Sequence, residues 1–438
     1  MQIKIDMPLQ VKKAIDILNK NGYKGYIVGG CVRDSLLGRE PEDFDLTTDA
    51  SPDEMLECFK NYRTIDNGLK HGTLTVIIDG CIMEITTHRI DGDYTDNRRP
   101  DSVSFSRKLT DDLSRRDFTV NAMAYSEQTG LVDEFNSIED LNNKIIRTVG
   151  NADKRFNEDA LRIIRALRFA SVLGFEIEEE TKIAIIENRS LLNNIAVERI
   201  AAELNKLVCG DCLDVLLNYR EVFAIFMPEF IPTFELEQNN DHHIYKVWEH
   251  IVRSVNFAPK DKITRLTMLF HDIGKGRFDG KDGHFHGHAE YSREMAQTIL
   301  KRLKYDNDTI NRVCMLVEHH DDKIEISESC VKRWLNRMGQ EDFKRLLDVK
   351  KADNMAKAPS YHYRQKDIAE LEKVLEKVIE EKQCFTLKGL AVNGNDVMAL
   401  GAKNEKVGVI LNELLRRVID DEIENDREKL LFVVKTML

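Results

Sequence analysis

The most informative part of the sequence is Ile27-Val28-Gly29-Gly30-Cys31-Val32-Arg33-Asp34, followed after a short polar segment by Asp43-Phe44-Asp45-Leu46. An apolar run that ends in two glycines predicts a strand and a sharp turn, because glycine lets the backbone approach a phosphate closely. We expect Asp43 and Asp45 in a second strand, where residues two apart point to the same face. Paired carboxylates favour Mg²⁺, which prefers oxygen ligands. Either half alone is more often a plain turn or a solvated loop, but together they predict a triphosphate site.

Length and composition are those of a large protein with several cores. The chain has 438 residues, 42% of them hydrophobic, which is enough for about three domains of ordinary size. It lacks an apolar run of the ~20 residues that a membrane span needs, and its first residues do not resemble a signal peptide. The eight cysteines are scattered, so a disulfide framework is not expected. We therefore expect a cytoplasmic protein without membrane contact.

Charge gives a mixed indication about nucleic acid. The 64 Lys and Arg residues are outnumbered by 76 Asp and Glu residues, so phosphate binding requires a local basic cluster. Residues 145–170 contain such an excess, six basic groups against three acidic ones: Arg147, Lys154, Arg155, Arg162, Arg165 and Arg168 against Asp153, Glu158 and Asp159. A solvated helix face explains this cluster equally well.

Apolar periodicity predicts one helix over residues 155–169. In such a helix Asp159 and Arg162 lie one turn apart on the same side. A carboxylate beside a guanidinium can read a base edge, because the carboxylate accepts from an exocyclic amine while the arginine donates to the neighbouring ring nitrogen. Cytosine and adenine present this pattern, and uracil and guanine present the reverse. A plain ion pair between the two residues is the alternative interpretation.

Five further blocks follow the opening stretch within the first 162 residues, at 68–76, 84–89, 94–100, 115–122 and 158–162. With this series the sequence resembles the class II tRNA nucleotidyltransferases and bacterial poly(A) polymerases, a branch of the polymerase β-like superfamily. The resemblance implies template-independent addition of CCA to tRNA 3′ ends from CTP and ATP with Mg²⁺, releasing pyrophosphate. Alternatives are a poly(A) polymerase or an enzyme that adds only A. Retention of Tyr94 and of residues 98–100 disfavours an enzyme that adds only CC.

The resemblance also assigns roles to residues. Asp43 and Asp45 would be catalytic and hold Mg²⁺. Independently of the resemblance, the strand-like position of Glu84 could add a third acid, with a solvated or paired side chain as the alternative. The nucleotide would be bound by Gly29, Gly30, Arg33, Arg115, Asp117, Asp159, Arg162, Arg165 and Arg168.

A second group of chemically active residues begins near residue 240. Seven of the twelve histidines lie between residues 250 and 320, a concentration that suits a transition-metal site. Their order resembles the HD phosphohydrolase superfamily. By that resemblance the first metal shell comprises His250, His271, Asp272 and Asp353, and a second ion is held by His288 and His320, with His319 as the alternative to His320. Hydrolysis of phosphoesters and a degenerate structural module are both open, and a phosphohydrolase with an RNA-binding head is the alternative from another class.

The expected fold is an α+β nucleotidyltransferase head with a small mixed sheet, followed by helical parts. We expect the head over residues 1–125, a helical neck and tRNA-binding region over 126–235, the HD domain over 236–360 and a helical C-terminal region over 361–438. Pro228 and Pro232 mark the clearest boundary. The oligomeric state is left open.

Overall fold

The computed structural model describes residues 4–92 and 102–438. By internal contacts the chain divides into two compact units, Met1–Pro228 and Glu229–Leu438, so the boundary falls at Pro228. Tyr94 and residues 98–100, on which the expectation against CC-only addition rests, lie outside the described residues.

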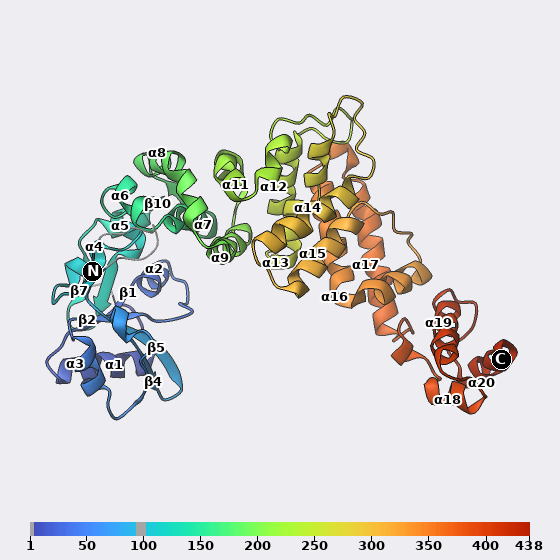
Figure 1. Ribbon diagram of the computed structural model, residues 1–438, viewed down its shortest axis with the longest axis horizontal. Coiled ribbons are helices and arrows are strands. Elements are labelled where there is room, and N and C mark those ends of the chain that lie inside the picture. Colours follow the sequence, from blue (N-terminus) through green and yellow to red (C-terminus); the bar gives the residue numbers. More distant parts are fainter. Residues whose placement is uncertain (1–3, 93–101) are drawn as a thin grey trace. The chain divides into compact units, whose positions relative to one another are not determined.

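Unit 1 contains a seven-stranded sheet in the order β3-β4-β5-β2-β1-β8-β9, and Figure 1 labels β1, β2, β4 and β5 of it. Its strands are β1 (Gly25–Val28), β2 (Leu46–Thr48), β3 (Arg63–Ile65), β4 (Thr73–Ile78), β5 (Cys81–Thr87), β8 (Met123–Ser126) and β9 (Gly130–Asp133). A small separate ribbon pairs β6 (Arg89–Asp91) with β7 (Val103–Phe105). Strand β2 runs parallel to β5, while the other neighbours in the large sheet are antiparallel. The expected mixed sheet is therefore present.

The apolar run before the glycines forms the buried strand β1, in register with β2 through Ile27 opposite Leu46. On its other side β1 pairs with β8, and β8 pairs with β9. The expected boundary at residue 125 falls inside β8, and the sheet continues to Asp133. The sequence after residue 125 predicts mainly helix, so these short strands were not expected. They form because β8 pairs with β1 and β9 pairs with β8.

The remainder of unit 1 is mainly helical. Helices α1 (Leu9–Lys20), α2 (Gly30–Leu36), α3 (Pro52–Cys58) and α4 (Leu109–Ser114) belong to the head; α5 (Ser137–Asn143), α6 (Ala152–Glu158), α7 (Leu161–Leu173), α8 (Glu179–Asn188), α9 (Val197–Val208), α10 (Leu213–Asn218) and α11 (Arg220–Phe226) follow, with the short pair β10 (Ile145–Ile146) and β11 (Glu176–Ile177) among them. Local signals start several of them: Ser51 and Glu54 form a capping box at α3, and Asn151 caps α6.

Unit 2 is helical throughout its described elements (Figure 1). Its α-helices are α12 (Val247–Phe257), α13 (Lys262–Phe270), α14 (His288–Arg302), α15 (Asn307–His319), α16 (Glu328–Met355), α17 (Arg364–Glu380), α18 (Gly394–Ala399), α19 (Glu405–Ile419) and α20 (Arg427–Met437), and short 3-10 helices lie between some of them. The backbone leaves helical geometry within α16 at Gly339, where φ is +79°. Among the helices described here, none is long and apolar enough to cross a membrane.

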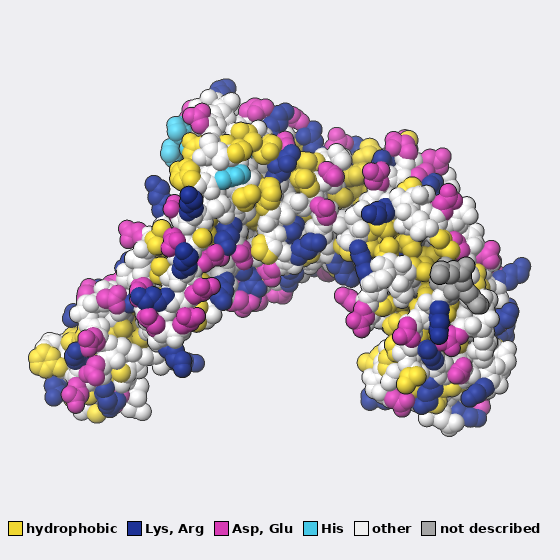
Figure 2. All heavy atoms as spheres, turned by 180° about the vertical axis from the view of Figure 1, so that it is seen from behind, with side chains coloured by type: hydrophobic (Ala, Val, Ile, Leu, Met, Phe, Trp, Pro, Cys, Tyr) yellow, Lys and Arg dark blue, Asp and Glu magenta, His cyan; other side chains and the backbone are white. Residues whose placement is uncertain are grey.

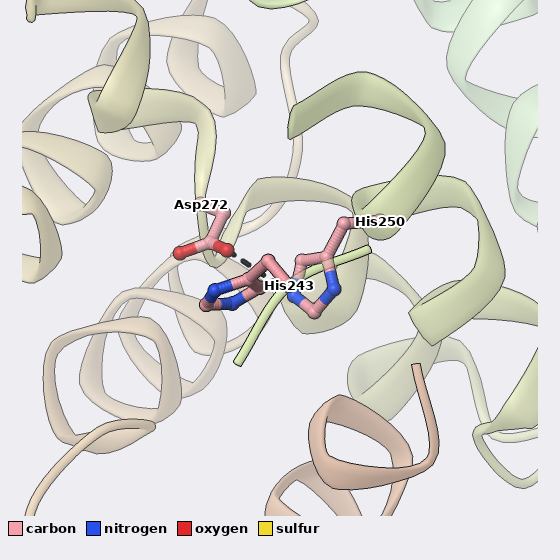
Figure 3. A group of neighbouring side chains, drawn as sticks. All are labelled: His243, His250 and Asp272. Atoms are coloured by element: carbon pink, nitrogen blue, oxygen red, sulfur yellow. Dashed lines mark ion pairs between the residues drawn. The ribbon is translucent and has the colours of Figure 1, made fainter. Parts of the chain in front are cut away.

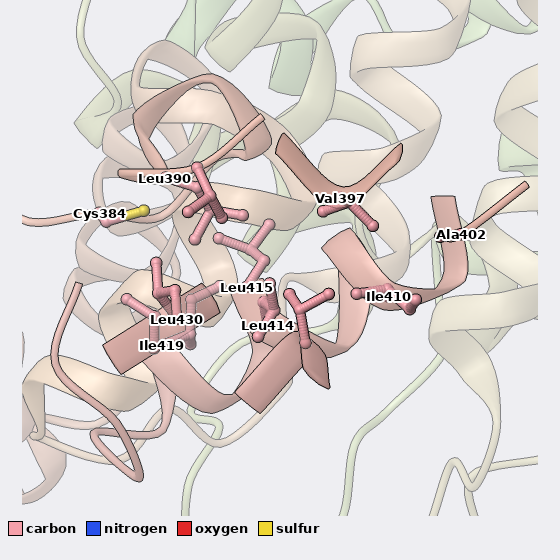
Figure 4. Close-up of a cluster of buried hydrophobic side chains, with 12 residues drawn as sticks. Cys384, Leu390, Val397, Ala402, Ile410, Leu414, Leu415, Ile419 and Leu430 are labelled. Carbon is pink, nitrogen blue, oxygen red and sulfur yellow. The ribbon is translucent and has the colours of Figure 1, made fainter. Parts of the chain in front are cut away.

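The C-terminal helices have a core of their own (Figure 4). Leu414 and Leu415 of α19 pack with Leu430 of α20 and with Val397 of α18. Apolar residues three and four apart on α19 put these side chains on one face of the helix. Two glycines stand at element ends in this region, Gly389 at the end of a short helix and Gly394 at the start of α18.

Candidate active site and candidate metal centre

The glycine turn connects β1 to α2. Gly29 has a φ of +81°, a conformation that residues with a side chain rarely adopt, and its N–H donates to the carbonyl of Met123 on β8 at 3.2 Å. A Cβ at Gly29 would lie 2.8 Å from Nη1 of Arg116, whereas a Cβ at Gly30 would lie at an ordinary 3.7 Å from Nη2 of Arg33. Position 29 therefore needs glycine for the turn, and a side chain there would also displace the end of the Arg116 guanidinium.

Asp43 and Asp45 lie in the segment just before β2, and not inside a strand as expected. The carbonyl of Asp45 accepts a hydrogen bond from the N–H of Val28 at 3.0 Å, so this segment lies alongside the end of β1. Desolvation raises the pKa of Asp45, and the charges of Asp43 and Glu84 raise it further against that of Arg116. Solvent still reaches both aspartates. A divalent cation would relieve the repulsion among these acids, so the donor set fits Mg²⁺.

A buried carboxylate outside the quoted motifs orients the two arginines of the 115–122 block. Oδ1 of Asp112 accepts from Nε and Nη2 of Arg115 at 3.0 and 2.6 Å, and Oδ2 accepts from Arg116 and from Oγ1 of Thr47, both at 3.3 Å. Burial would raise the pKa of Asp112, but the two guanidinium groups outweigh it and lower the pKa. Its helical spacing of three and four residues from the arginines is the signal by which the sequence could have revealed it.

Asp117 is buried and holds other predicted site residues in place. Its carboxylate accepts from the N–H of Phe118 at 2.8 Å, from Nδ2 of Asn121 at 3.0 Å and from Nε of Arg165 at 2.9 Å. Nη1 of Arg33 donates to Oδ1 of Asn121 at 2.6 Å. Burial opposes ionisation, but the charge of Arg165 outweighs it and keeps the pKa of Asp117 below its usual range. Arg33, Asp117 and Arg165 therefore form one connected network.

Arg165 and Arg168 of α7 share Glu203 of α9, at N–O distances of 3.4 and 2.6 Å. The guanidinium of Arg168 also lies 3.7 Å from the ring centroid of Phe169, and burial lowers the pKa of Arg168 to about 10. These two arginines are thus paired within the protein and do not form a solvated helix face. Glu203 lies thirty-five residues beyond Arg168 in the chain, and no sequence motif predicts that it pairs with these arginines.

The helix predicted over residues 155–169 is interrupted, which corrects that expectation. Helix α6 ends at Glu158, Asp159 is extended, and α7 starts at Leu161. The carboxylate of Asp159 pairs with Arg199 of α9 at 3.3 and 2.8 Å, while Arg162 donates to Glu158 at 2.7 Å and to the carbonyl of Arg115 at 2.9 Å. Asp159 and Arg162 therefore have different side-chain partners. They do not form the mutual ion pair of the alternative interpretation. A partner 40 residues away lies beyond the reach of a local pattern.

Unit 2 brings the predicted metal ligands together from five helices or their ends. His250 lies on α12, His271 and Asp272 follow α13, His288 starts α14, His320 follows α15, and Asp353 lies near the end of α16. Gly274 permits the tight junction after Asp272, since a Cβ there would lie 2.5 Å from the carbonyl oxygen of His288. The turn that carries Asp272 therefore packs directly against α14.

In all four of these histidines Nδ1 lies against a backbone carbonyl. The pairs are His250 with Ala356 at 3.3 Å, His271 with Met268 at 2.7 Å, His288 with Phe285 at 2.9 Å and His320 with Val317 at 2.7 Å. A carbonyl only accepts, so a neutral ring in this position carries its proton on Nδ1 and presents the lone pair of Nε2. Metal-binding histidines in proteins are oriented in this way.

The first candidate ligand set comprises His250, His271, Asp272 and Asp353. Oδ2 of Asp272 lies 3.3 Å from Nε2 of both His250 and His271, and Oδ1 of Asp353 lies 3.1 Å from Nε2 of His250. The two Nε2 atoms are 3.3 Å apart. Two lone pairs at this distance repel each other unless a proton or a cation lies between them, so the geometry suits a shared metal ion.

The second ligand set consists of Asp272, His288 and His320. Oδ1 of Asp272 lies 3.2 Å from Nε2 of His288 and 3.7 Å from Nε2 of His320. This oxygen is buried and has no hydrogen-bond partner among the described residues, an unfavourable state that a cation would relieve. The two oxygens of Asp272 face different sets, so a divalent cation in either set would find a carboxylate oxygen of Asp272 beside it. His319 lies elsewhere, with Nδ1 2.8 Å from Asp322.

Basic side chains surround this centre. Lys275 donates to Asp272 at 2.7 Å and Lys357 donates to Asp353 at 2.6 Å. Burial opposes ionisation, but these charges hold the pKa values of both carboxyl groups well below the usual range. The centre opens into a pocket of about 390 Å³ that Arg364 also lines, and Figure 2 shows histidine side chains (cyan) exposed on unit 2. A positive pocket beside a metal centre suits an anionic ligand such as a phosphoester.

Three family models match the chain. The poly A polymerase head domain matches residues 25–147, the probable RNA and SrmB-binding site of polymerase A matches residues 174–232, and the putative tRNA nucleotidyltransferase domain 2 matches residues 285–434. The CCA-adding enzyme of Enterococcus faecalis is 32% identical over 98% of this chain and 97% of that protein, and that of Levilactobacillus brevis is 33% identical over 97% and 96%. The chain belongs to the CCA-adding enzyme family.

Other members of the CCA-adding enzyme family match in part or by structure. The CCA-adding enzyme of Geobacillus thermodenitrificans is 53% identical over 193 residues, which are 44% of this chain and 47% of that protein. In this match the chain spans about half the length of its relative. The crystal structure of the Bacillus stearothermophilus CCA-adding enzyme in complex with CTP is 29% identical, covers 98% of both chains and gives a TM-score of 0.72. The Thermotoga maritima CCA-adding enzyme complexed with tRNA, at 18% identity and a TM-score of 0.57 over 98% of this chain and 94% of that one, shares the fold.

Proposed function

We propose that this protein adds CCA to the 3′ ends of tRNA from CTP and ATP and releases pyrophosphate. The observation that carries the proposal is the crowding of Asp43 and Asp45 beside the left-handed Gly29 turn, in a chain of the CCA-adding enzyme family. A cytoplasmic location fits this substrate.

Asp43 and Asp45 would hold Mg²⁺ at this site. The bound ion supplies positive charge for the triphosphate and makes a 3′-hydroxyl more acidic. Gly29 leaves the backbone open to the phosphates, while Arg115, fixed by Asp112, binds the sugar and phosphates. Attack of the terminal 3′-hydroxyl of the tRNA on the α-phosphorus then forms the new phosphodiester bond, and pyrophosphate leaves.

Asp159 and Arg162 select the base in this proposal. A carboxylate offers about four acceptor positions, so Asp159 can retain Arg199 and still accept from the exocyclic amine of cytosine or adenine. The contacts of Arg162 with Glu158, with Arg155 and with Arg115 use three of the five N–H groups of its guanidinium. The remaining donors can bind the ring nitrogen next to the amine.

The test uses tRNA transcripts that end before CCA, after C and after CC, each supplied with single labelled nucleotides and with pairs. Completion of CCA followed by arrest is the expected result. Addition of A alone to the CC end would reduce the protein to an A-adding enzyme, and long A tails would make it a poly(A) polymerase. Asp43→Asn is the inactive control. If the wild-type protein incorporates no more nucleotide than this control, the proposal fails.

For unit 2 we propose a metal-dependent phosphohydrolase activity, carried by the two ligand sets that share Asp272. Metal ions at His250, His271, Asp353, His288 and His320 would supply an activated water and charge for phosphate oxygens. Hydrolysis of bis-p-nitrophenyl phosphate with added Mn²⁺, Co²⁺ or Ni²⁺ tests it. Asp272→Asn should abolish hydrolysis and leave nucleotide addition unchanged, and wild-type protein without hydrolysis under all three metals would refute the activity.

A further inference from the structure

His243 lies next to the first ligand set, on the segment that leads into α12. Its ring packs edge-on against that of His250, with centroids 4.8 Å apart and an interplanar angle of 85°. The ligand atoms of His243, His250 and Asp272 all lie within 4.8 Å of one another. Figure 3 shows the three side chains as neighbours, with the ion pair between Asp272 and His250 dashed. These three residues form a group of ligand atoms that could hold one metal ion.

The hydrogen bonds of Asn240 fix the tautomer of His243. Nδ2 of Asn240 donates to the carbonyls of Gln238 and Gly283 at 3.0 and 3.3 Å, which places Oδ1 on the other side. There Oδ1 accepts from the backbone N–H groups of His242 and His243, both at 3.1 Å. Nδ1 of His243 is 2.9 Å from the same oxygen. An amide oxygen only accepts, so Nδ1 carries the proton and the neutral ring presents the lone pair of Nε2.

The lone pair of Nε2 is buried and unused within the part of the chain that the structure describes. Nε2 of His243 is inaccessible to solvent and lacks a hydrogen-bond partner among the described residues. A buried acceptor without a donor is unfavourable, and a metal ion beside His250 and Asp272 would satisfy it. The four predicted metal-binding histidines show the same arrangement, with Nδ1 donating to an oxygen and Nε2 directed inward.

We propose that His243 is a further ligand of the metal centre and binds the ion of the first set through Nε2. The inference rests on the metal-dependent function proposed for unit 2 and extends the ligand set by a residue from outside the helices. It also predicts that the ion immobilises the segment from Gln238 to His243, because the metal ties this segment to α12 and to the junction after α13.

Metal titration of the full-length protein tests the proposal. The probe is Co²⁺, whose affinity is followed by calorimetry and whose visible absorption reports its nitrogen and oxygen ligands. His243→Ala should weaken one of the two binding events by about tenfold or more and change the absorption of the bound ion. The matched control is His284→Ala, an exposed histidine that stacks on His286 at the rim of the same pocket, and it should bind like the wild type.

The outcomes separate this inference from the metal centre itself. Asp272→Asn is expected to lose Co²⁺ binding. If the wild-type protein also binds no Co²⁺, the metal centre as a whole is rejected. Wild-type affinity and an unchanged spectrum in His243→Ala, together with loss of binding in Asp272→Asn, would reject His243 alone. Hydrogen exchange gives an independent readout: Co²⁺ should protect residues 238–243 in the wild type and in His284→Ala but not in His243→Ala. Equal protection in His243→Ala would contradict the proposal.

Discussion

Exchange of Arg162 for alanine tests how the incoming base is chosen. The guanidinium donates to Glu158 at 2.7 Å, to the carbonyl of Arg155 at 3.1 Å and to that of Arg115 at 2.9 Å, which leaves two N–H donors for the base. Cytosine offers a ring nitrogen that accepts, whereas uracil offers an N–H, and a mismatched buried contact costs about 1–3 kcal/mol. Arg162→Ala should therefore lower the preference for CTP over UTP by about 5- to 150-fold.

The assay measures kcat/KM for CTP and for UTP in single-nucleotide addition to a tRNA transcript. Arg162→Ala also removes internal contacts, so the rate should fall with both nucleotides, and only the ratio reports on base selection. Arg155→Ala is the matched control, because Arg155 donates to the same Glu158 at 2.9 Å but lies on α6. It should lower the rate with little effect on the ratio. An unchanged CTP/UTP ratio in Arg162→Ala would refute the assigned role.

Four other substitutions test other parts of the structure. Asp43→Asn should reduce nucleotide addition below detection while filter binding shows unchanged affinity for tRNA, and residual addition near the wild-type rate would remove Asp43 from the metal site. Gly29→Ala should cost about 1–3 kcal/mol from its φ of +81° and its approach to Arg116, seen as a lower urea midpoint by circular dichroism, with Gly30→Ala nearly neutral by the same measurement. Leu414→Ala in the core of Figure 4 should cost about 2–5 kcal/mol, whereas Val409→Ala at an exposed site should stay within about 0.5 kcal/mol; equal losses would contradict the assigned core. Burial raises the pKa of the Asp261 carboxyl group, but hydrogen bonds from Arg345 and Thr264 outweigh this effect and lower the pKa to about 2. The ionised carboxylate therefore stabilises the folded protein above pH 3.8, and this stabilisation is lost as the pH falls through about 2. This is about 1 kcal/mol after allowance for partial exposure, and acid titration of Trp fluorescence, which reports Trp248 and Trp334 of unit 2, should show a smaller acid-dependent loss in Asp261→Asn.

Several features followed from local sequence alone. The apolar run before Gly29 became the buried strand β1, and the two glycines formed the turn into α2. Strand alternation and glycine geometry depend on residues adjacent in the chain, so a short pattern predicts them. The ordered blocks also predicted the family, and the histidine-rich segment predicted ligands that unit 2 brings together.

Other features were decided only when distant residues met. The apolar period continued through residues 155–169, yet the helix breaks at Asp159, whose carboxylate pairs with Arg199 on another helix. Adjacent His319 and His320 cannot be told apart by spacing, but the end of α15 directs His320 toward Asp272 and leaves His319 beside Asp322.

The sequence by itself therefore determined the local elements, the residue types of both sites and the family. Packing between distant segments decided which charges pair, as with Glu203 and Arg199, and which imidazole nitrogens lie beside Asp272, as with Nε2 of His250 and His288. The physical reason is that ion pairs and metal ligation depend on distances of a few ångströms between side chains, and those distances are fixed by the packing of elements far apart in the chain.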